Sequence, residues 1–458
     1  MLPDDVLLSI FDFCADEREI TKEEIEAWQS LVHVCRRWRT LVFGSPRRLN
    51  LRLVCTENTP VRNTLGVWPP LPLVVQSSLS EGVGDIVAIL EHRDRVDRIY
   101  FSQADRSALE TVLAAMLEPF PELTDLRMLS RDETLPVVPD SFLGRSAPRL
   151  RNIVLSGIPF PGLPRLLLSC TRLVTLILSN IPHSGYISPD AMVTALSVLT
   201  SLESLIVGFL SPQSCPALAI RRPLPSTRAV LPVLTRFSFN GVCQYLDNFV
   251  ALIDAPRLDR FNITFFNDTV FDAPHFIQFI GRTPTLKPSE NTHLVFGYHA
   301  ARVSFSQTSG YGSLKVRILC KELDWQVSSL EQICTSCLPP LFATENLYIY
   351  QNPYPNPQPD WQDNIENSLW LELLHPFSTV KNLHLSKEFV PRIAPALQEL
   401  VGSRTTEVLP TVQNIFLENL GPSGPVHEGI GKFVAARQLS GHPITVSLWE
   451  RSVAEVDR

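Results

Sequence analysis

The sequence predicts a mixed α/β protein: a short all-α module at the amino terminus, followed by a long array of alternating strands and helices. Three observations support this prediction. Apolar residues recur at helical spacing over residues 6–42, a second apolar pattern returns many times after residue 96, and 38 prolines are spread along the 458 residues. Because proline breaks helices, its even spread favours many short elements joined by many turns.

Composition limits the classes of function. The chain is 45% hydrophobic and 19% charged, as folded proteins are, and its formal net charge of −7 argues against nucleic acid as the main partner. No apolar run reaches the roughly 20 residues that span a bilayer, so no membrane partner is expected. Nine cysteines, an odd number in apolar surroundings, are typical of reduced thiols in the cytoplasm or the nucleus.

Residues 1–47 predict two amphipathic helices. Pro3 and Asp4 favour the start of the first helix, whose apolar stripe consists of Val6, Leu7, Ile10, Phe11 and Cys14. The second helix is predicted to run from a capping-box pattern at residues 21–24 to a stop at Gly44 and Pro46. So short a module cannot form a stable core alone, so its apolar stripe predicts either a partner or a packed neighbouring domain.

Residues 2–11 and 31–39 together resemble an F-box, the motif that docks a protein onto the Skp-type adaptor of a cullin-RING ubiquitin ligase. The likeness is carried by the initial Leu-Pro, the Ile-Phe pair and the run Val-Cys-Arg-x-Trp-Arg. The resemblance implies that the adaptor-contacting or core positions are Leu2, Pro3, Leu7, Ile10, Phe11, Val34, Cys35, Trp38 and Leu41. The segment 16–27 is longer and more acidic than the usual link between F-box helices.

A triplet of apolar residues, with two residues between the first pair and one between the second, returns nine times. The triplets are Val96-Ile99-Phe101, Leu123-Leu126-Met128, Leu150-Ile153-Leu155, Leu173-Leu176-Leu178, Leu202-Leu205-Val207, Leu234-Phe237-Phe239, Leu258-Phe261-Ile263, Val380-Leu383-Leu385 and Val412-Ile415-Leu417. The first seven begin 27, 27, 23, 29, 32 and 24 residues apart. This drifting period predicts an irregular leucine-rich-repeat solenoid, a horseshoe in which each repeat is a strand plus a helical return segment.

Return helices are predicted over residues 106–117, 188–199 and 391–402. Alternation in 302–306 and 313–319 around two glycines predicts a β-hairpin inserted within 293–320. A proline-rich tract at 352–359 predicts a rigid surface loop, with a polyproline II ligand as the alternative. The predicted domains are therefore the helical motif 1–47, a connector 48–95 and the repeat domain 96–450.

The sequence contains no pattern that predicts catalysis or a cofactor. Cys334 and Cys337 have the spacing of a metal or redox pair, but without a second pair or a nearby histidine cluster they predict a structural pair at a helix end. No phosphate-binding loop, dinucleotide fingerprint or nucleophile elbow is present. We therefore expect neither an enzyme nor a bound metal.

The F-box resemblance implies a substrate receptor that binds the Skp-family adaptor, and through it cullin, while the solenoid holds a target protein for ubiquitination. Over most of its length the chain also resembles the F-box-like proteins that basidiomycete fungi carry in large families, notably at residues 42–51 and 359–364. Strand residues between the apolar anchors are expected to face the concave side. The predicted target-binding residues are Arg236, Asn240, Arg260, Asn262, Asn382 and His384.

The alternative is a non-catalytic interaction scaffold outside any ligase, with the amino-terminal helices as a cap on the repeats. The scaffold hypothesis predicts that Phe11 and Trp38 are buried within the chain. The receptor hypothesis predicts that replacing exposed members of the stripe, for which we take Leu7 and Ile10, removes adaptor binding and leaves the solenoid intact.

Overall fold

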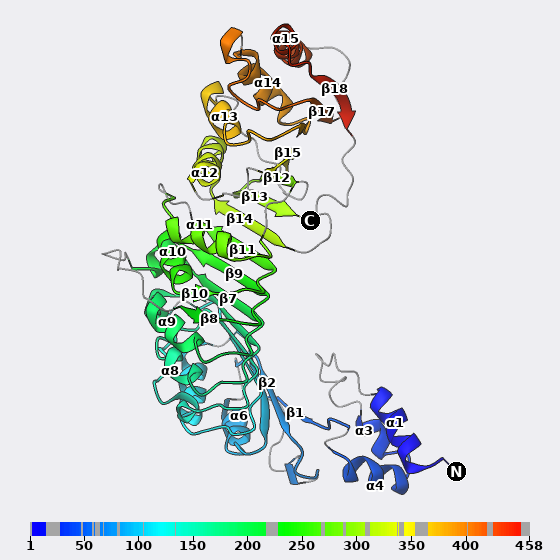
Figure 1. The fold of residues 1–458 in the computed structure, drawn as a ribbon. Helices are drawn as coiled ribbons and strands as arrows, with labels where there is room; N and C mark the ends of the chain where they lie inside the picture. The colour runs from blue at the N-terminus through cyan, green and yellow to red at the C-terminus, as the bar shows by residue number, and fades with distance from the viewer. Residues whose placement is uncertain are drawn as a thin grey trace. The chain divides into compact units, whose positions relative to one another are not determined.

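The computed structural model describes residues 2–14, 28–46, 49–56, 59, 65–66, 68–79, 83–103, 105–132, 134–216, 228–266, 271–286, 290–306, 312–336, 338, 343–352, 365–400, 402–418 and 425–449. The chain divides into two compact units, Met1–Leu202 (unit 1) and Glu203–Arg458 (unit 2). Both units are mixed α/β and are built on large, mostly parallel β-sheets (Figure 1).

Unit 1 begins with a helical module of α1 (Asp4–Cys14), α3 (Trp28–Val32) and α4 (Arg36–Gly44). These helices share one hydrophobic core with the residues that lead into the sheet, and the buried members of that core are Leu7, Leu8, Phe11, Trp28, Val32, Val42, Leu49, Leu51 and Leu71. The indole Nε1 of Trp28 also donates a hydrogen bond of 2.8 Å to the carbonyl oxygen of Arg52, directly before β1 (Leu53–Cys55). The module is therefore packed onto the start of the sheet.

The prediction of one continuous second helix is wrong over residues 33–35, where α3 ends and α4 begins. Cys35 is extended at this point, and its Sγ accepts a hydrogen bond from the backbone N–H of Trp38 at 3.5 Å, so it caps α4. The turn sets α4 so that the ring of Trp38 packs edge-on against Phe11, with ring centroids 4.7 Å apart. The predicted start at residues 21–24 lies outside the described residues, and the predicted end at Gly44 is confirmed.

The unit 1 strands run parallel and lie side by side in chain order. After β1 they are β2 (Leu73–Ser77), β3 (Val96–Phe101), β4 (Asp125–Leu129), β5 (Asn152–Ser156) and β6 (Thr175–Ile181). The helices α6 (Val83–Leu90), α7 (Arg106–Ala115), α8 (Leu163–Leu167) and α9 (Pro189–Leu196) lie on one face of this sheet (Figure 1).

The unit 2 sheet has the strand order β7-β9-β11-β14-β13-β12-β15-β16-β17-β18. These strands are β7 (Ser204–Phe209), β9 (Arg236–Gly241), β11 (Arg260–Phe265), β12 (Asn291–Phe296), β13 (Ala300–Ser306), β14 (Ser313–Leu319), β15 (Asn346–Gln351), β16 (Asn382–Leu385), β17 (Asn414–Glu418) and β18 (Thr445–Trp449). A separate pair consists of β8 (Ala229–Val230) and β10 (Ile253–Asp254).

The helices of unit 2 are α10 (Cys243–Ala251), α11 (Pro274–Arg282), α12 (Leu323–Ser336), α13 (Asn367–Leu374), α14 (Val390–Gln398) and α15 (Pro425–Leu439). In Figure 1, α10, α11, α12 and α13 follow one face of the sheet. Short 3-10 helices cover Phe142–Arg145 and His183–Gly185 in unit 1, and Pro212–Ser214 and Gly402–Arg404 in unit 2.

The antiparallel pairing predicted around residues 307–312 is confirmed, because β13 pairs antiparallel with β14. The structure adds a third strand: β12 also pairs antiparallel with β13, while β12 and β14 pair parallel with β15 and β11 on their other sides. The chain therefore makes a three-stranded meander in which β13 alone runs against its neighbours.

Every predicted apolar triplet coincides with a strand and its approach, and all three apolar residues of each triplet are buried. Two predicted return helices are present as α7 and α9, and Ser188 caps α9 by accepting from the N–H of Ala191. The third, α14, ends at Gln398, four residues before the predicted end. The proline-rich tract lies outside the described residues from Pro353 onwards.

Candidate functional site

The face of the unit 2 sheet opposite its helices, called the open face below, carries the predicted target-binding residues. On β9, the buried Phe237 packs against Phe249 of α10, with ring centroids 5.5 Å apart, so the alternating residues point to the other face. The open face has Arg236 and Asn240 on β9, Arg260 and Asn262 on β11, and Asn382 and His384 on β16. Because β14, β13, β12 and β15 lie between β11 and β16, the six residues form two separate groups.

A ladder of four asparagines runs across the open face from β12 to β17. The Nδ2 of Asn346 donates to Oδ1 of Asn291 at 2.9 Å, that of Asn382 to Asn346 at 2.7 Å, and that of Asn414 to Asn382 at 2.8 Å. The four residues are in register as the first position of their strands. The side chain of the predicted residue Asn382 is therefore used in holding neighbouring strands together.

Directly beside the asparagines lies a stack of four rings, one from each of the same strands: His293, Tyr348, His384 and Phe416. Successive ring centroids are 4.6, 4.2 and 4.4 Å apart, with interplanar angles of 11°, 17° and 8°. The indole of Trp449 on β18 lies against the two middle rings of the stack, with its centroid 5.2 Å from that of His384 and 5.9 Å from that of Tyr348. Because the rings face one another, their edges point away from the sheet.

Both histidines of this stack are held in the neutral form. Burial lowers the pKa of His293 to about 4, and the charges of Arg302 and Lys315 add to the effect. Burial likewise lowers the pKa of His384 to about 4, with a further contribution from His293. The Nδ1 atoms of both rings are buried and have no hydrogen-bond partner among the residues that the structure describes, so protonation there would place an unpaired charge inside the stack.

A group of cations lies on the open face beside the stack. Lys315 on β14 is in register with Ser304 on β13, which is in register with His293 on β12. One pleat further along, Arg317 on β14 stands directly opposite Arg302 on β13. Burial lowers the pKa of Lys315, and the charges of Arg302 and Arg260 lower it further.

The sequence analysis did not predict the rings of His293, Tyr348 and Phe416 or the cations of β13 and β14 as site residues. Alternation of polar and apolar residues in 302–306 and 313–319 did mark two strands. The alternation did not indicate which other strands would pair with these two. The residues that lie beside Lys315 and Arg302 therefore could not be predicted.

The nine predicted adaptor-binding residues differ in exposure and fall into three groups in the helical module. Five are exposed, namely Leu2 (52%), Pro3, Ile10 (44%), Val34 (58%) and Cys35, whereas Trp38 and Leu41 are half-buried. The expectation that Leu7 is exposed is wrong: Leu7 is 5% and Phe11 1% exposed, because both side chains belong to the core beneath α1. The apolar pattern of the first predicted helix did not distinguish Leu7 and Phe11, which are buried, from Ile10, which is exposed.

The exposed group is held together at one end of the module by Arg37. Its Nη2 donates to the carbonyl oxygen of Leu2 at 2.6 Å, and its Nε donates to Oδ1 of Asp4 at 3.1 Å. The start of α1 therefore lies against the first turn of α4. Val34, three residues before Arg37 in the sequence, is also exposed.

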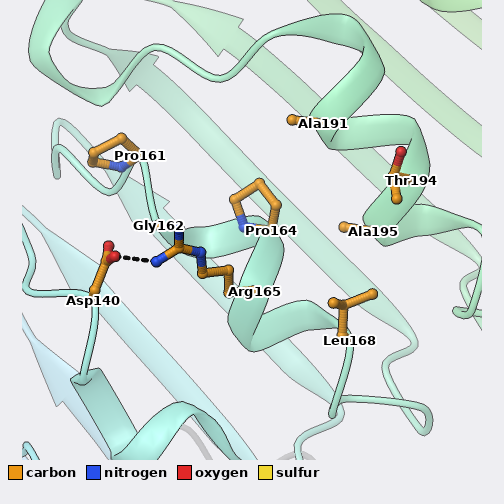
Figure 2. A pocket seen from close by; sticks show the side chains of 9 residues that line it. All are labelled: Asp140, Pro161, Gly162, Pro164, Arg165, Leu168, Ala191, Thr194 and Ala195. Carbon is orange, nitrogen blue, oxygen red and sulfur yellow. Dashed lines mark hydrogen bonds and ion pairs between the residues drawn. The ribbon is translucent and has the colours of Figure 1, made fainter.

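Figure 2 shows a pocket of about 420 Å³ on unit 1, lined by Asp140, Pro161, Gly162, Pro164, Arg165, Leu168, Ala191, Thr194 and Ala195. Its two charged groups, Asp140 and Arg165, pair with each other. The hydroxyl of Thr194 donates to the carbonyl oxygen of Asp190 within its own helix. The lining offers no nucleophile beside a base, so we do not take this pocket as the candidate site.

Burial raises the pKa of the Cys170 thiol and of the Cys320 thiol to about 11. Cys334 is buried in α12, and Cys337 lies outside the described residues. Within the described ranges, no three His, Cys, Asp or Glu side chains are grouped so that they could hold a metal ion. In the same part of the chain, no helix has the length and apolarity to cross a bilayer.

No protein-family model matches the chain, and the search of curated proteins found no match.

Proposed function

We propose that this protein is the substrate-receptor subunit of a cullin-RING ubiquitin ligase of the Skp-adaptor type. In this proposal the helical module 1–47 acts as an F-box, and the strand–helix units form an irregular leucine-rich-repeat array whose open face binds a target protein. The observation that carries the proposal is the exposure of large apolar residues at the start of α1 and before α4.

The exposed apolar group fits a docking surface better than a solvated helix face. Leu2, Val6 and Ile10 lie at four-residue spacing along one side of α1 and its approach, and each is more than two-fifths exposed. The Arg37 contacts hold Leu2 against α4, near the exposed Val34. Clustered exposed apolar side chains on a small module are typical of a protein interface.

The mechanism of such a receptor is proximity. The helical module would tether the chain to the ligase, and the open face would hold the target so that its lysines remain near the ubiquitin-charged enzyme. Holding two reactants together raises their effective concentration without bond chemistry in the receptor itself. The mixed polar surface of Arg236, Asn262 and their neighbours is suited to a peptide or protein.

The test is co-purification with a fungal Skp-family adaptor. Ile10→Asp and Val34→Asp each put a charge on the exposed surface without touching the buried core, and both are expected to abolish adaptor binding. Leu168→Asp is the matched control, because Leu168, the C-cap residue of α8, is 51% exposed and lies outside the helical module. Adaptor binding that survives both module variants, or that is absent from a folded wild-type chain, would overturn the proposal.

The alternative is an interaction scaffold whose helical module caps the repeats. The burial of Phe11, and the core that α1 shares with Leu49, Leu51 and Leu71, favours this alternative. It predicts that Ile10→Asp and Val34→Asp change no interaction. A wild-type chain that is folded and monomeric in the presence of the adaptor would favour the scaffold.

A further inference from the structure

The cations on the open face of unit 2 are placed against one another rather than against acids. Arg302 on β13 and Arg317 on β14 are direct cross-strand partners, and Lys315 lies on the same face one pleat away. Directly opposed side chains on neighbouring strands have Cβ atoms roughly 5 Å apart, where like charges destabilise the pair. A second like-charged pair, Arg236 and Arg260, is in register on β9 and β11.

These charges have little compensation within the protein. Arg302, Lys315 and Arg317 have no carboxylate within ion-pair distance in the described part of the chain, and the Nε of Arg302 is buried without an acceptor. Asp259 is engaged with other groups: its Oδ2 lies 4.0 Å from the Nε of Arg260, and its Oδ1 accepts from the N–H of Gly312. Arg302 and Lys315 are half-buried, whereas Arg317 is exposed. Like charges held together in partly buried positions are costly, and a bound anion would offset that cost.

We propose that the open face of unit 2 binds an acidic peptide segment, with its carboxylates on Arg302, Lys315 and Arg317 and its next residues against the partly exposed rings of Tyr348 and Phe416. This deepens the proposed function by stating the chemistry of the target, and it rests on the open face being the target-binding surface. From β14, which carries Lys315, to β15, which carries Tyr348, is three strand spacings, roughly 14 Å, which matches about four residues of an extended peptide.

The surroundings favour a peptide over a nucleic acid. The whole chain has a net charge of −7, so a long polyanion would meet repulsion as soon as it left this patch. The row that contains Lys315 continues through Ser304 and His293 to Tyr348 and its neighbours. Aromatic ring edges carry partial positive charge and contact both carbonyl oxygens and side chains, as a peptide would require.

The test measures binding of a fluorescein-labelled hexaglutamate peptide to the full chain by fluorescence anisotropy, with labelled hexaglutamine as the uncharged probe. Lys315→Gln and Arg302→Gln are each expected to weaken hexaglutamate binding at least tenfold. Both variants relieve repulsion between cations, so they are expected to fold, and a urea titration checks that they do. Arg257→Gln removes the same charge from an exposed turn residue before β11 and is expected to change binding less than twofold.

Three results would overturn the proposal: no hexaglutamate binding to folded wild-type protein at low salt, equal losses in Arg257→Gln and Lys315→Gln, or tighter binding of a single-stranded oligonucleotide that the same variants remove. The last result would assign the patch to nucleic acid. Because no adaptor is present in this assay, its failure leaves the adaptor experiment on Ile10 and Val34 unaffected. Loss of adaptor binding in that experiment likewise leaves the peptide result standing.

Discussion

The ring stack makes the stability of unit 2 depend on pH, and His384→Phe isolates that dependence. Phenylalanine keeps a planar ring between Tyr348 and Phe416, whose centroids lie 4.2 and 4.4 Å from that of His384. It removes the titrating nitrogens and with them the buried, unpartnered Nδ1. The variant is therefore expected to fold and to lack one of the two groups that resist protonation in the native state.

The sign and size of the change in stability with pH follow from the lowered pKa of His384. In the unfolded chain His384 titrates near 6.5, and in the folded chain near 4. Between these values the unfolded state binds more protons, so stability falls as the pH falls from about 6.5 to about 4 and is fully present above 6.5. At about 1.4 kcal/mol per pKa unit, the whole difference is worth about 3 kcal/mol. His293 behaves in the same way and keeps its own share in the variant.

The assay is urea unfolding of the wild type and His384→Phe at several pH values from about 7 down to about 4.5, followed by tryptophan fluorescence. Trp449 lies 5.2 Å from the His384 ring and reports on the stack. Comparing the two proteins at each pH cancels the carboxylates that titrate in the same range. We expect the variant to gain about 2 kcal/mol relative to the wild type over this interval. A difference that stays constant with pH would refute the buried, neutral assignment of His384.

Four further variants test the fold by the same urea titration. Asn382→Ala removes two ladder hydrogen bonds and Asn414→Ala one, so we expect losses of about 2 and about 1 kcal/mol, and equal losses would contradict the ladder. Arg437→Gln withdraws a buried guanidinium from three backbone carbonyl oxygens and is expected to cost about 3 kcal/mol. Gly157→Ala is expected to cost about 2–4 kcal/mol, since Gly157 has φ +71° and a Cβ there would lie 2.4 Å from the carbonyl oxygen of Ser130. Unchanged stability in Arg437→Gln or in Gly157→Ala would contradict the contacts given for that residue.

The strands of the array could be predicted wherever all three anchor positions are apolar, because burial then leaves a direct trace in the sequence. β15 escaped prediction because its first anchor position holds Thr344, with Leu347 and Ile349 following at the usual spacing. Thr344 is fully buried, and its hydroxyl pairs with that of Thr292 at 2.8 Å. A polar residue satisfied by a distant partner is invisible to a pattern based on hydrophobicity alone.

The candidate site was less predictable because it depends on strand order. The rings of His293, Tyr348 and His384 stack only because β12 pairs with β15 and β15 with β16. In the sequence, β12 follows β11, yet in the sheet β14 and β13 separate them. Periodicity indicates which face a residue takes within its strand, whereas the neighbours across strands follow from the antiparallel meander. The prediction therefore found His384 and missed the rings it stacks with.

The burial of individual residues in the helical module determines which variants can distinguish a loss of adaptor binding from a loss of folding. A chain that begins at Leu49 would lose α1, α3 and α4 and leave Leu49, Leu51 and Leu71 without the side chains that now bury them. Loss of binding in such a truncation would be ambiguous, because the first strands would lose part of their core. Loss of binding after replacement of Leu7 would be ambiguous for the same reason, since its side chain lies in that core. Ile10 is on the same helix but half open to solvent, so a charge there tests the interface while the core beneath it remains intact.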